Sequence, residues 1–95
     1  MPAYIVATVT ILDQDKFKTY GAAIAGLSEK FGGEPLVRGP VAEVLEGDGI
    51  VGERVVVTRF PDADAARGYI GSAEYRAAAA NRVGAAVVVM RLIEG

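Results

Sequence analysis

The chain has 95 residues, of which 52% are hydrophobic and 23% charged, and its formal net charge is −2. This length allows one domain, and the composition is that of a globular protein rather than a disordered one. The acidic and basic residues are interspersed, without the Lys/Arg cluster that would follow a phosphate backbone. We therefore expect neither nucleic acid nor a membrane surface as a partner.

Cysteine and histidine are both absent from the sequence. The chain therefore has no disulfide, no thiolate nucleophile, no imidazole base, and no thiolate or imidazole ligand for zinc, haem or an iron–sulfur cluster. Acid–base chemistry would fall to Asp, Glu, Tyr, Lys or Arg. No carboxylate spacing typical of a calcium loop is present, so we expect no metal and no cofactor.

Targeting signals are also missing. Residues 1–4 lack the basic segment of a signal peptide, and the longest run of small apolar residues, 84–90, is far shorter than the ~20 residues that cross a bilayer. These features predict a soluble, cytoplasmic protein.

Four segments carry strand signals. Residues 3–11 are rich in β-branched side chains, which favour strands. Residues 36–46 predict a second strand, interrupted at Gly39–Pro40 because proline donates no ladder hydrogen bond. Residues 53–60 and the valine-rich 84–93 predict the third and fourth strands.

Helix signals lie between these strands. The following apolar residues recur at helical spacing: Phe17, Tyr20, Ile24, Leu27 and Phe31. They predict one amphipathic helix, capped by Asp13 and ended by Gly32–Gly33. Asp62 is expected to cap a second helix, and Ser72 a short continuation of it through Ala80.

The resulting order, β-α-β-β-α-β, is typical of the ferredoxin-like α+β fold, a four-stranded antiparallel sheet with two helices on one face. The other face of the sheet should then be polar, yet Val55–Val57 and Val87–Val89 make the third and fourth strands apolar on both sides. A monomer would expose a large apolar patch. We therefore predict an obligate homodimer in which sheet faces sheet about a two-fold axis.

A few charged and polar residues are candidates for a site. Arg38 and Glu43 flank the interruption in the second strand, where a paired Arg and Glu would stay ionised and could hold a small carboxylate or enolate. The same two residues could instead form a salt bridge that closes a bulge. Arg54 and Arg59, at opposite ends of the third strand, either reach an anionic ligand or are solvated strand ends.

Three other residues could either belong to a site or have a purely structural role. Ser72 opens a helix whose free N–H groups suit an anion, or it is only a cap. Tyr4 and Tyr75 each offer a phenol on an apolar body, which also suits core packing with a wet tip.

Several short segments, in this order, carry a resemblance: Ala-Tyr-Ile-Val-Ala at 3–7, Phe-Gly-Gly at 31–33, Leu-Val-Arg-Gly at 36–39, Val-Leu-Glu-Gly at 44–47, Arg-Val-Val-Val-Thr-Arg-Phe-Pro at 54–61 and Ser-Ala-Glu-Tyr at 72–75. With them the whole chain resembles the uncharacterised family called domain of unknown function 1330. The resemblance implies the dimeric α/β-barrel form of the ferredoxin-like fold, and it draws attention to Arg38, Glu43, Tyr75 and Arg82. Pro40 departs from the small residue usual there, which implies a stiffer loop beside Arg38.

Together these observations lead to a functional hypothesis. A small acidic molecule would bind between sheet and helices, with Arg38 and Arg82 neutralising its acid, while Ser72 and Tyr4 provide further contacts. Glu43 or Tyr75 would transfer a proton, as in a cofactor-independent oxygenase or isomerase, a class suggested by fold analogy. Two alternatives are open: a ligand-binding or sensing dimer without catalysis, and a purely structural or partner-binding domain, which predicts that any pocket stays below the ~300 Å³ of a ligand site.

Overall fold

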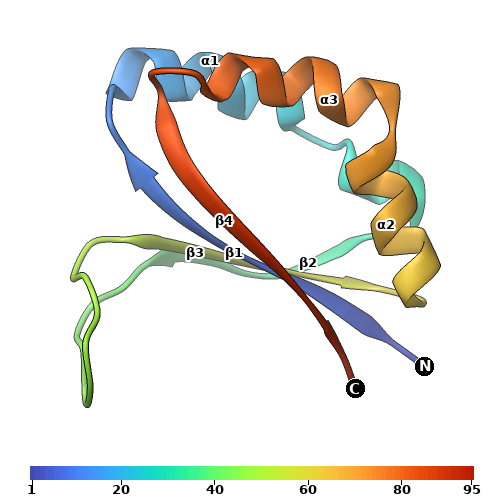
Figure 1. Ribbon diagram of the computed structural model, residues 1–95, viewed down its shortest axis with the longest axis horizontal. Coiled ribbons are helices and arrows are strands. Elements are labelled where there is room, and N and C mark those ends of the chain that lie inside the picture. Colours follow the sequence, from blue (N-terminus) through green and yellow to red (C-terminus); the bar gives the residue numbers. More distant parts are fainter.

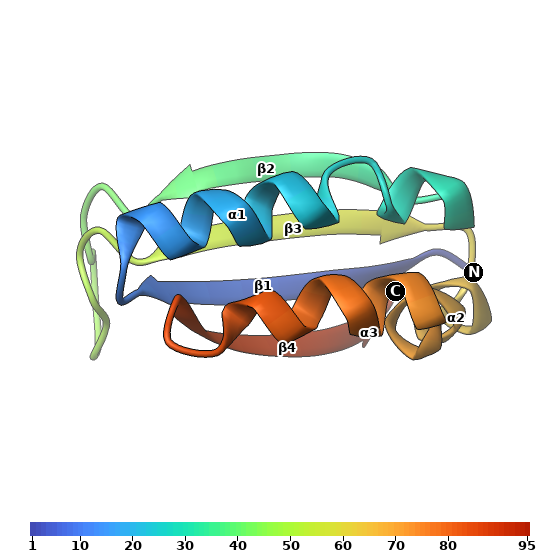
Figure 2. The same ribbon diagram turned by 90° about the horizontal axis from the view of Figure 1, so that it is seen from above.

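The computed structural model describes residues 1–95 and contains a four-stranded antiparallel sheet with all helices on one face (Figure 1). The strands are β1 (Ala3–Ile11), β2 (Glu34–Pro40), β3 (Arg54–Phe60) and β4 (Ala86–Glu94), and their spatial order is β2-β3-β1-β4. The helices are α1 (Gln14–Ile24), α2 (Ala63–Gly71) and α3 (Ala73–Ala79), with 3-10 turns η1 (Ser28–Phe31) and η2 (Ala80–Arg82). Seen from above, α1 and α3 run side by side across the sheet (Figure 2). The predicted ferredoxin-like architecture is confirmed.

Side-chain caps start all three α-helices where the sequence predicts them. The Asp13 carboxylate accepts a hydrogen bond from the Lys16 N–H at 3.0 Å, and Asp62 accepts one from the Ala65 N–H at 2.7 Å. The Ser72 hydroxyl accepts one from the Tyr75 N–H at 3.1 Å. Each cap satisfies a backbone donor that has no partner within its helix.

The first helix is shorter than predicted. It ends at Ile24, and the chain turns at Gly26, whose φ of 76° lies in the left-handed region. The separate turn η1 follows and ends at Gly32, with φ 82°. The prediction of a single helix as far as Phe31 is therefore wrong. Gly26 allows the chain to leave the helix, and the spacing of the apolar residues does not reveal this break. Leu27 still packs against the core as expected.

The second strand also differs from its prediction. It ends at Pro40 instead of Glu46, and its irregular register lies between Pro35 and Val37 rather than at Gly39–Pro40. Past Pro40 the chain leaves the sheet as a loop of residues 41–53, which we call the arm. A hydrogen bond of 2.7 Å from the Val41 N–H to the Glu53 carbonyl closes its base. The arm projects to the side of the sheet away from the helices (Figure 1).

The core gathers at the α2 end of the molecule. Its buried cluster consists of Ile5, Phe60, Ala66, Tyr69 and Tyr75. Phe60 is only 1% exposed, and its ring stacks on that of Tyr69 with centroids 5.8 Å apart. Tyr69 meets the Tyr75 ring edge-on at 5.0 Å. Only 12 of the 95 residues are buried, so each aromatic contact carries a large share of the stability.

The sheet surface opposite the helices, which we call the open face, is formed by alternate residues of each strand. Directly opposed residues of antiparallel strands share a face, and Val57 lies opposite Val6 in the register. The open face comprises Tyr4, Val6, Thr8, Thr10, Val37, Val55, Val57, Arg59, Val87, Val89, Arg91 and Ile93. Val37 and Val87 are each 54% exposed. The prediction that β3 and β4 are apolar on both sides is thus confirmed.

None of the helices has the length and apolar character needed to cross a membrane.

Candidate functional site

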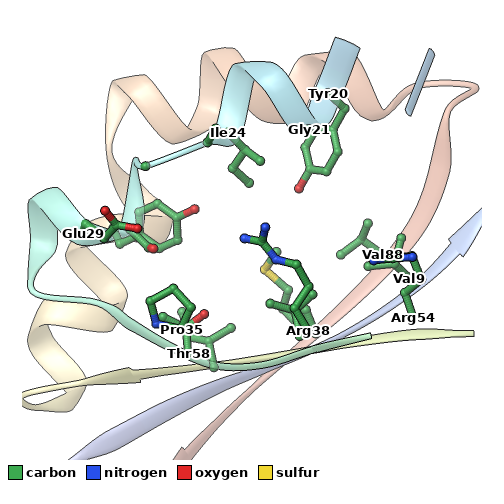
Figure 3. A pocket seen from close by; sticks show the side chains of 18 of the residues that line it. Val9, Tyr20, Gly21, Ile24, Glu29, Pro35, Arg38, Arg54, Thr58 and Val88 are labelled. Carbon is green, nitrogen blue, oxygen red and sulfur yellow. The ribbon is translucent and has the colours of Figure 1, made fainter. Parts of the chain in front are cut away.

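A cavity of about 270 Å³ lies between α1 and the helix-covered face of the sheet (Figure 3). Small residues on α1 and the turn after it create this space, because Gly21, Ala25 and Gly26 line it where larger side chains would fill it. A Cβ atom built at Gly21 would meet no heavy atom within 4 Å. Most of the remaining wall is apolar: Ile5, Ala7, Val9, Phe17, Ile24, Pro35, Val56, Val88 and Met90.

A small number of polar groups enter this cavity from different elements. In Figure 3 the Tyr20 hydroxyl of α1 points into the space, and the Arg38 side chain rises from β2 toward it. Arg54 of β3 and Glu29 of η1 also line it. None of these charged side chains forms an ion pair within 4 Å, since both ion pairs of the protein involve Arg67. The lining thus contains two positively charged guanidinium groups and only one carboxylate, which is exposed, and this balance of charge favours an anionic ligand.

A second layer of polar side chains supports the Tyr20 end of the cavity. Arg82 donates a hydrogen bond from Nη1 to the Tyr75 hydroxyl at 2.9 Å, and that hydroxyl donates to Met90 Sδ at 3.3 Å. The Arg82 guanidinium carbon lies 5.8 Å from the ring centroids of both Tyr20 and Tyr75. Both distances are within the range of a cation–π interaction, so Arg82 attracts the rings of Tyr20 and Tyr75 at the same time.

Burial determines the protonation of two phenols in and beside the cavity. Desolvation raises the pKa of Tyr20 above its usual value; Tyr75 raises it further, while the Arg82 charge opposes the shift. Desolvation likewise raises the pKa of Tyr69 well above its usual range, with Tyr75 and Tyr20 adding to the effect. A phenol is neutral at physiological pH in any case, and these upward shifts extend the neutral state of both tyrosines to higher pH.

Alkaline titration should reveal these two phenols. Their folded pKa values exceed the unfolded one of about 10, so above that pH the unfolded state loses protons first and stability falls as pH rises. We expect tyrosinate absorbance for Tyr20 and Tyr69 to appear only together with loss of the folded circular dichroism signal. Tyr20→Phe should make the alkaline loss of stability less steep, and ionisation of both phenols in the folded protein would contradict this account.

Some of the predicted site residues line the cavity and others do not. Arg38 lines the cavity, as does Arg54. Glu43 is exposed in the arm and does not line it, so the predictions that Glu43 lies in a strand and pairs with Arg38 are wrong. The physical reason is that the chain leaves the sheet at Pro40, which carries Glu43 away from Arg38.

Five other candidates lie outside the cavity wall. Tyr75 and Arg82 form the layer behind Tyr20 and Met90. Ser72 caps α3 and its hydroxyl also donates to the Tyr69 carbonyl at 2.7 Å, so its one donor proton is not available to an anionic ligand. Tyr4 belongs to the open face, on the other side of the sheet, as does the exposed Arg59.

The sequence pattern does not reveal two polar residues of the cavity. Tyr20 belongs to the helical stripe predicted to pack in the core, yet its hydroxyl points into the cavity (Figure 3). Glu29 is exposed and also lines the cavity. The available signal was the phenol itself, because a tyrosine on a buried stripe requires a polar partner or a wet tip.

Several solved structures of other proteins share the fold of this chain. The RPA0582 protein of unknown function from Rhodopseudomonas palustris is 20% identical, with a TM-score of 0.77 over 99% of this chain and 82% of that one. A dimeric ferredoxin-like protein of unknown function from Jannaschia sp. CCS1 is 16% identical, with a TM-score of 0.76 over both full chains. SnoaB, a cofactor-independent oxygenase from Streptomyces nogalater, is 15% identical, with a TM-score of 0.70 over 99% and 92%.

No curated protein sequence matches this chain. The model of one family does match it, over residues 2–95, and its description is domain of unknown function, DUF1330. The match spans nearly the entire chain and agrees with the resemblance seen in the sequence. The protein belongs to the DUF1330 family.

Proposed function

We propose that the cavity beneath α1 binds a small acidic organic molecule. The observation that carries the proposal is that Arg38 and Arg54 line a largely apolar space and neither has an ion-pair partner. A ligand carboxylate would supply the missing anion, and the apolar walls would enclose its body. The volume, about 270 Å³, is slightly below the ~300 Å³ at which drug-sized sites begin, so the ligand is of single-ring size.

The chemistry proposed for this site is proton transfer on the bound acid, in a cofactor-independent isomerase or oxygenase. SnoaB shows that an oxygenase without a cofactor uses this fold. Glu29 is the one carboxylate in the lining and takes the role of base, which was expected of Glu43. Arg38 stabilises the resulting enolate, and Tyr20 donates a hydrogen bond as a neutral phenol, which the upward shift of its pKa leaves neutral. Tyr75 and Arg82 position Tyr20.

A binding or sensing role without catalysis uses the same cavity and is the second candidate. It is favoured by the exposure of Glu29 at the cavity rim, since enzymes usually exclude water from their reacting groups. The variant Glu29→Gln distinguishes the two candidates: it removes a negative charge from the lining and should not weaken binding of an acid in either case, whereas it should abolish turnover if the protein is an enzyme.

Binding of benzoate tests the proposed acid site, with neutral benzamide as the comparison of equal shape. Calorimetric titration should show that Arg38→Gln weakens benzoate binding roughly tenfold or more, because a charge-assisted hydrogen bond contributes about 1.5–3 kcal/mol. Benzamide affinity should change little. Arg38 is exposed and has no ion-pair partner, so the melting temperature of Arg38→Gln should equal that of the wild type.

Glu43→Gln is the matched control, because it changes one charge in the arm, outside the cavity. Equal benzoate affinity in wild type and Arg38→Gln would refute the acid site. A fall in melting temperature with unchanged affinity would make Arg38 structural.

We also propose that the protein acts as a homodimer joined through the open face. Val37, Val87, Val89 and Ile93 on this face are each 45–54% exposed, and a second copy would remove this apolar surface from water. Several proteins with the same fold are described as dimeric, including that from Jannaschia sp. CCS1.

The arm provides a second reason for this dimer. It projects on the same side as the open face (Figure 1) and exposes Leu45 (87%), Ile50 (57%) and Val51 (65%). An apolar projection beside an apolar face is self-complementary about a two-fold axis, because each copy offers the arm and receives it.

A further inference from the structure

The arm of residues 41–53 is strongly acidic. It contains four carboxylates and no basic residue, so its net charge is −4, twice that of the whole chain. The carboxylates belong to Glu43, Glu46, Asp48 and Glu53, and the first three are exposed. None of them belongs to either ion pair of the protein. The arm therefore presents unpaired negative charge beside its exposed apolar side chains.

The open face carries positive charge within its apolar surface. Two of its residues are arginines, Arg59 and Arg91, and both are exposed. Neither has an ion-pair partner within 4 Å. The strands place one carboxylate on this side, that of Glu34, which lies opposite Arg59 in the register. Two guanidinium groups in an apolar surface therefore complement the carboxylates and apolar side chains of the arm.

Both arginines lie at the end of the open face that is remote from the arm. The arm leaves the sheet between Pro40 and Arg54, and Arg59 lies five residues further along β3, about 17 Å at ~3.4 Å per residue. Arg59 is opposite Tyr4, near the N-terminus, and Arg91 is close to the C-terminus. Figure 1 shows the arm at the opposite end of the sheet from the two termini. The arm of the same copy therefore makes no contact with these guanidinium groups.

A two-fold axis can bring two open faces together in two orientations. If the axis runs along the strands, each arm meets the other copy at the end that carries the second arm, so both acidic arms gather at one end and repel each other. If the axis crosses the strands, the two ends are exchanged, and each arm meets the end that carries Arg59 and Arg91 on the other copy. The distribution of charge along the sheet therefore favours the second orientation.

We propose that the two-fold axis of the dimer crosses the strands and that the arm of each copy lies on the Arg59–Arg91 end of the other copy's open face. This orientation rests on the dimer proposed above and adds to it a specific charged contact. Exposed arm carboxylates, such as Glu46 and Asp48, pair with the two guanidinium groups, and the apolar side chains of the arm cover Ile93, which is 49% exposed. Charge pairs of this kind determine the orientation of an interface more than its affinity.

Two charge-reversed variants test this orientation at low ionic strength. The face variant combines Arg59→Glu with Arg91→Glu, and the arm variant combines Glu46→Lys with Asp48→Lys. Each variant alone opposes like charges in both arm contacts of its homodimer, so the dimer dissociation constant of each should rise at least about tenfold. A mixture of the two restores opposite charges in both contacts. Native mass spectrometry of an equimolar mixture should therefore show the heterodimer in at least about tenfold excess over either homodimer.

The matched control combines Lys18→Glu on α1 with Arg76→Glu on α3, which reverses two exposed charges on the helix side of the sheet. It should dimerise as the wild type does, and its homodimer should outweigh its heterodimer with the arm variant. All the substituted residues are exposed, so the variants should keep the wild-type circular dichroism spectrum. Arg91→Glu alone, mixed with the arm variant, provides a milder form of the same test.

The outcomes separate this orientation from the dimer itself. Dimers that form in the wild type, together with random pairing of the two reversed variants, would overturn the orientation and leave the dimer in place. Reversed variants that each dimerise as tightly as the wild type would do the same. A wild-type chain that stays monomeric would overturn both the dimer and its orientation.

Discussion

Val57→Glu is expected to separate the proposed homodimer into monomers. Val57 lies on the central part of the open face, opposite Val6 of β1 and Val37 of β2, so the two-fold contact would enclose two new carboxylates in an apolar surface. Burying an unpaired charge costs several kcal/mol. We expect the dimer dissociation constant to rise by at least about a hundredfold, as measured by analytical ultracentrifugation over a dilution series.

Val83→Glu serves as the control for this change, because Val83 is 86% exposed next to η2, away from the open face. It introduces the same carboxylate and should leave the association state unchanged. Leu45→Glu in the arm should weaken the dimer to an intermediate degree. A wild-type chain that remains a folded monomer at high concentration, or a Val57→Glu chain that dimerises normally, would contradict the proposed contact.

Phe60→Ala should cost most of the folding free energy. Phe60 is the largest fully buried side chain, and it stacks on Tyr69 at the centre of the core cluster. Truncation of a buried Phe to Ala costs about 3–5 kcal/mol, while small domains have only ~5–15 kcal/mol in total. Urea unfolding followed by circular dichroism should show the midpoint shifted strongly downward without a change in slope.

Phe60→Leu retains most of the volume and should lose far less, about 1.5 kcal/mol or below. A loss in Phe60→Ala no larger than in Phe60→Leu would mean that the core relaxes around the vacant volume. In that case the aromatic cluster would contribute less to stability than its burial implies.

The sequence predicted the elements well because local chemistry determines them. Residues 3–11 form a strand at the predicted bounds, and Asp13, Asp62 and Ser72 cap the helices as expected. The errors occur where glycine or proline permits several outcomes. Gly26 breaks the first helix, and Pro40 ends a strand that the apolar pattern would have continued.

The candidate site was less predictable, because it depends on how distant segments meet. Strand alternation and spacing could not show that Arg38 and Arg54 face the same cavity, since their common face follows from the register between β2 and β3. Tyr75 and Arg82 are seven residues apart and meet through the turn of α3 into η2. That pairing requires the helix end to be known, and the sequence pattern locates helix ends poorly.

The small residues of α1 and the turn after it have a consequence for ligand choice at the proposed site. Gly21 and Gly26 have no side chain and Ala25 has only a methyl group, so a larger residue at any of these positions narrows the cavity. Widening must come from the larger side chains of the wall, such as Phe17 and Ile24 on α1 or Met90 on the sheet, and shortening these costs packing. Selectivity at such a site is therefore asymmetric: a single added side chain excludes larger molecules, whereas admission of them requires the loss of packed apolar volume.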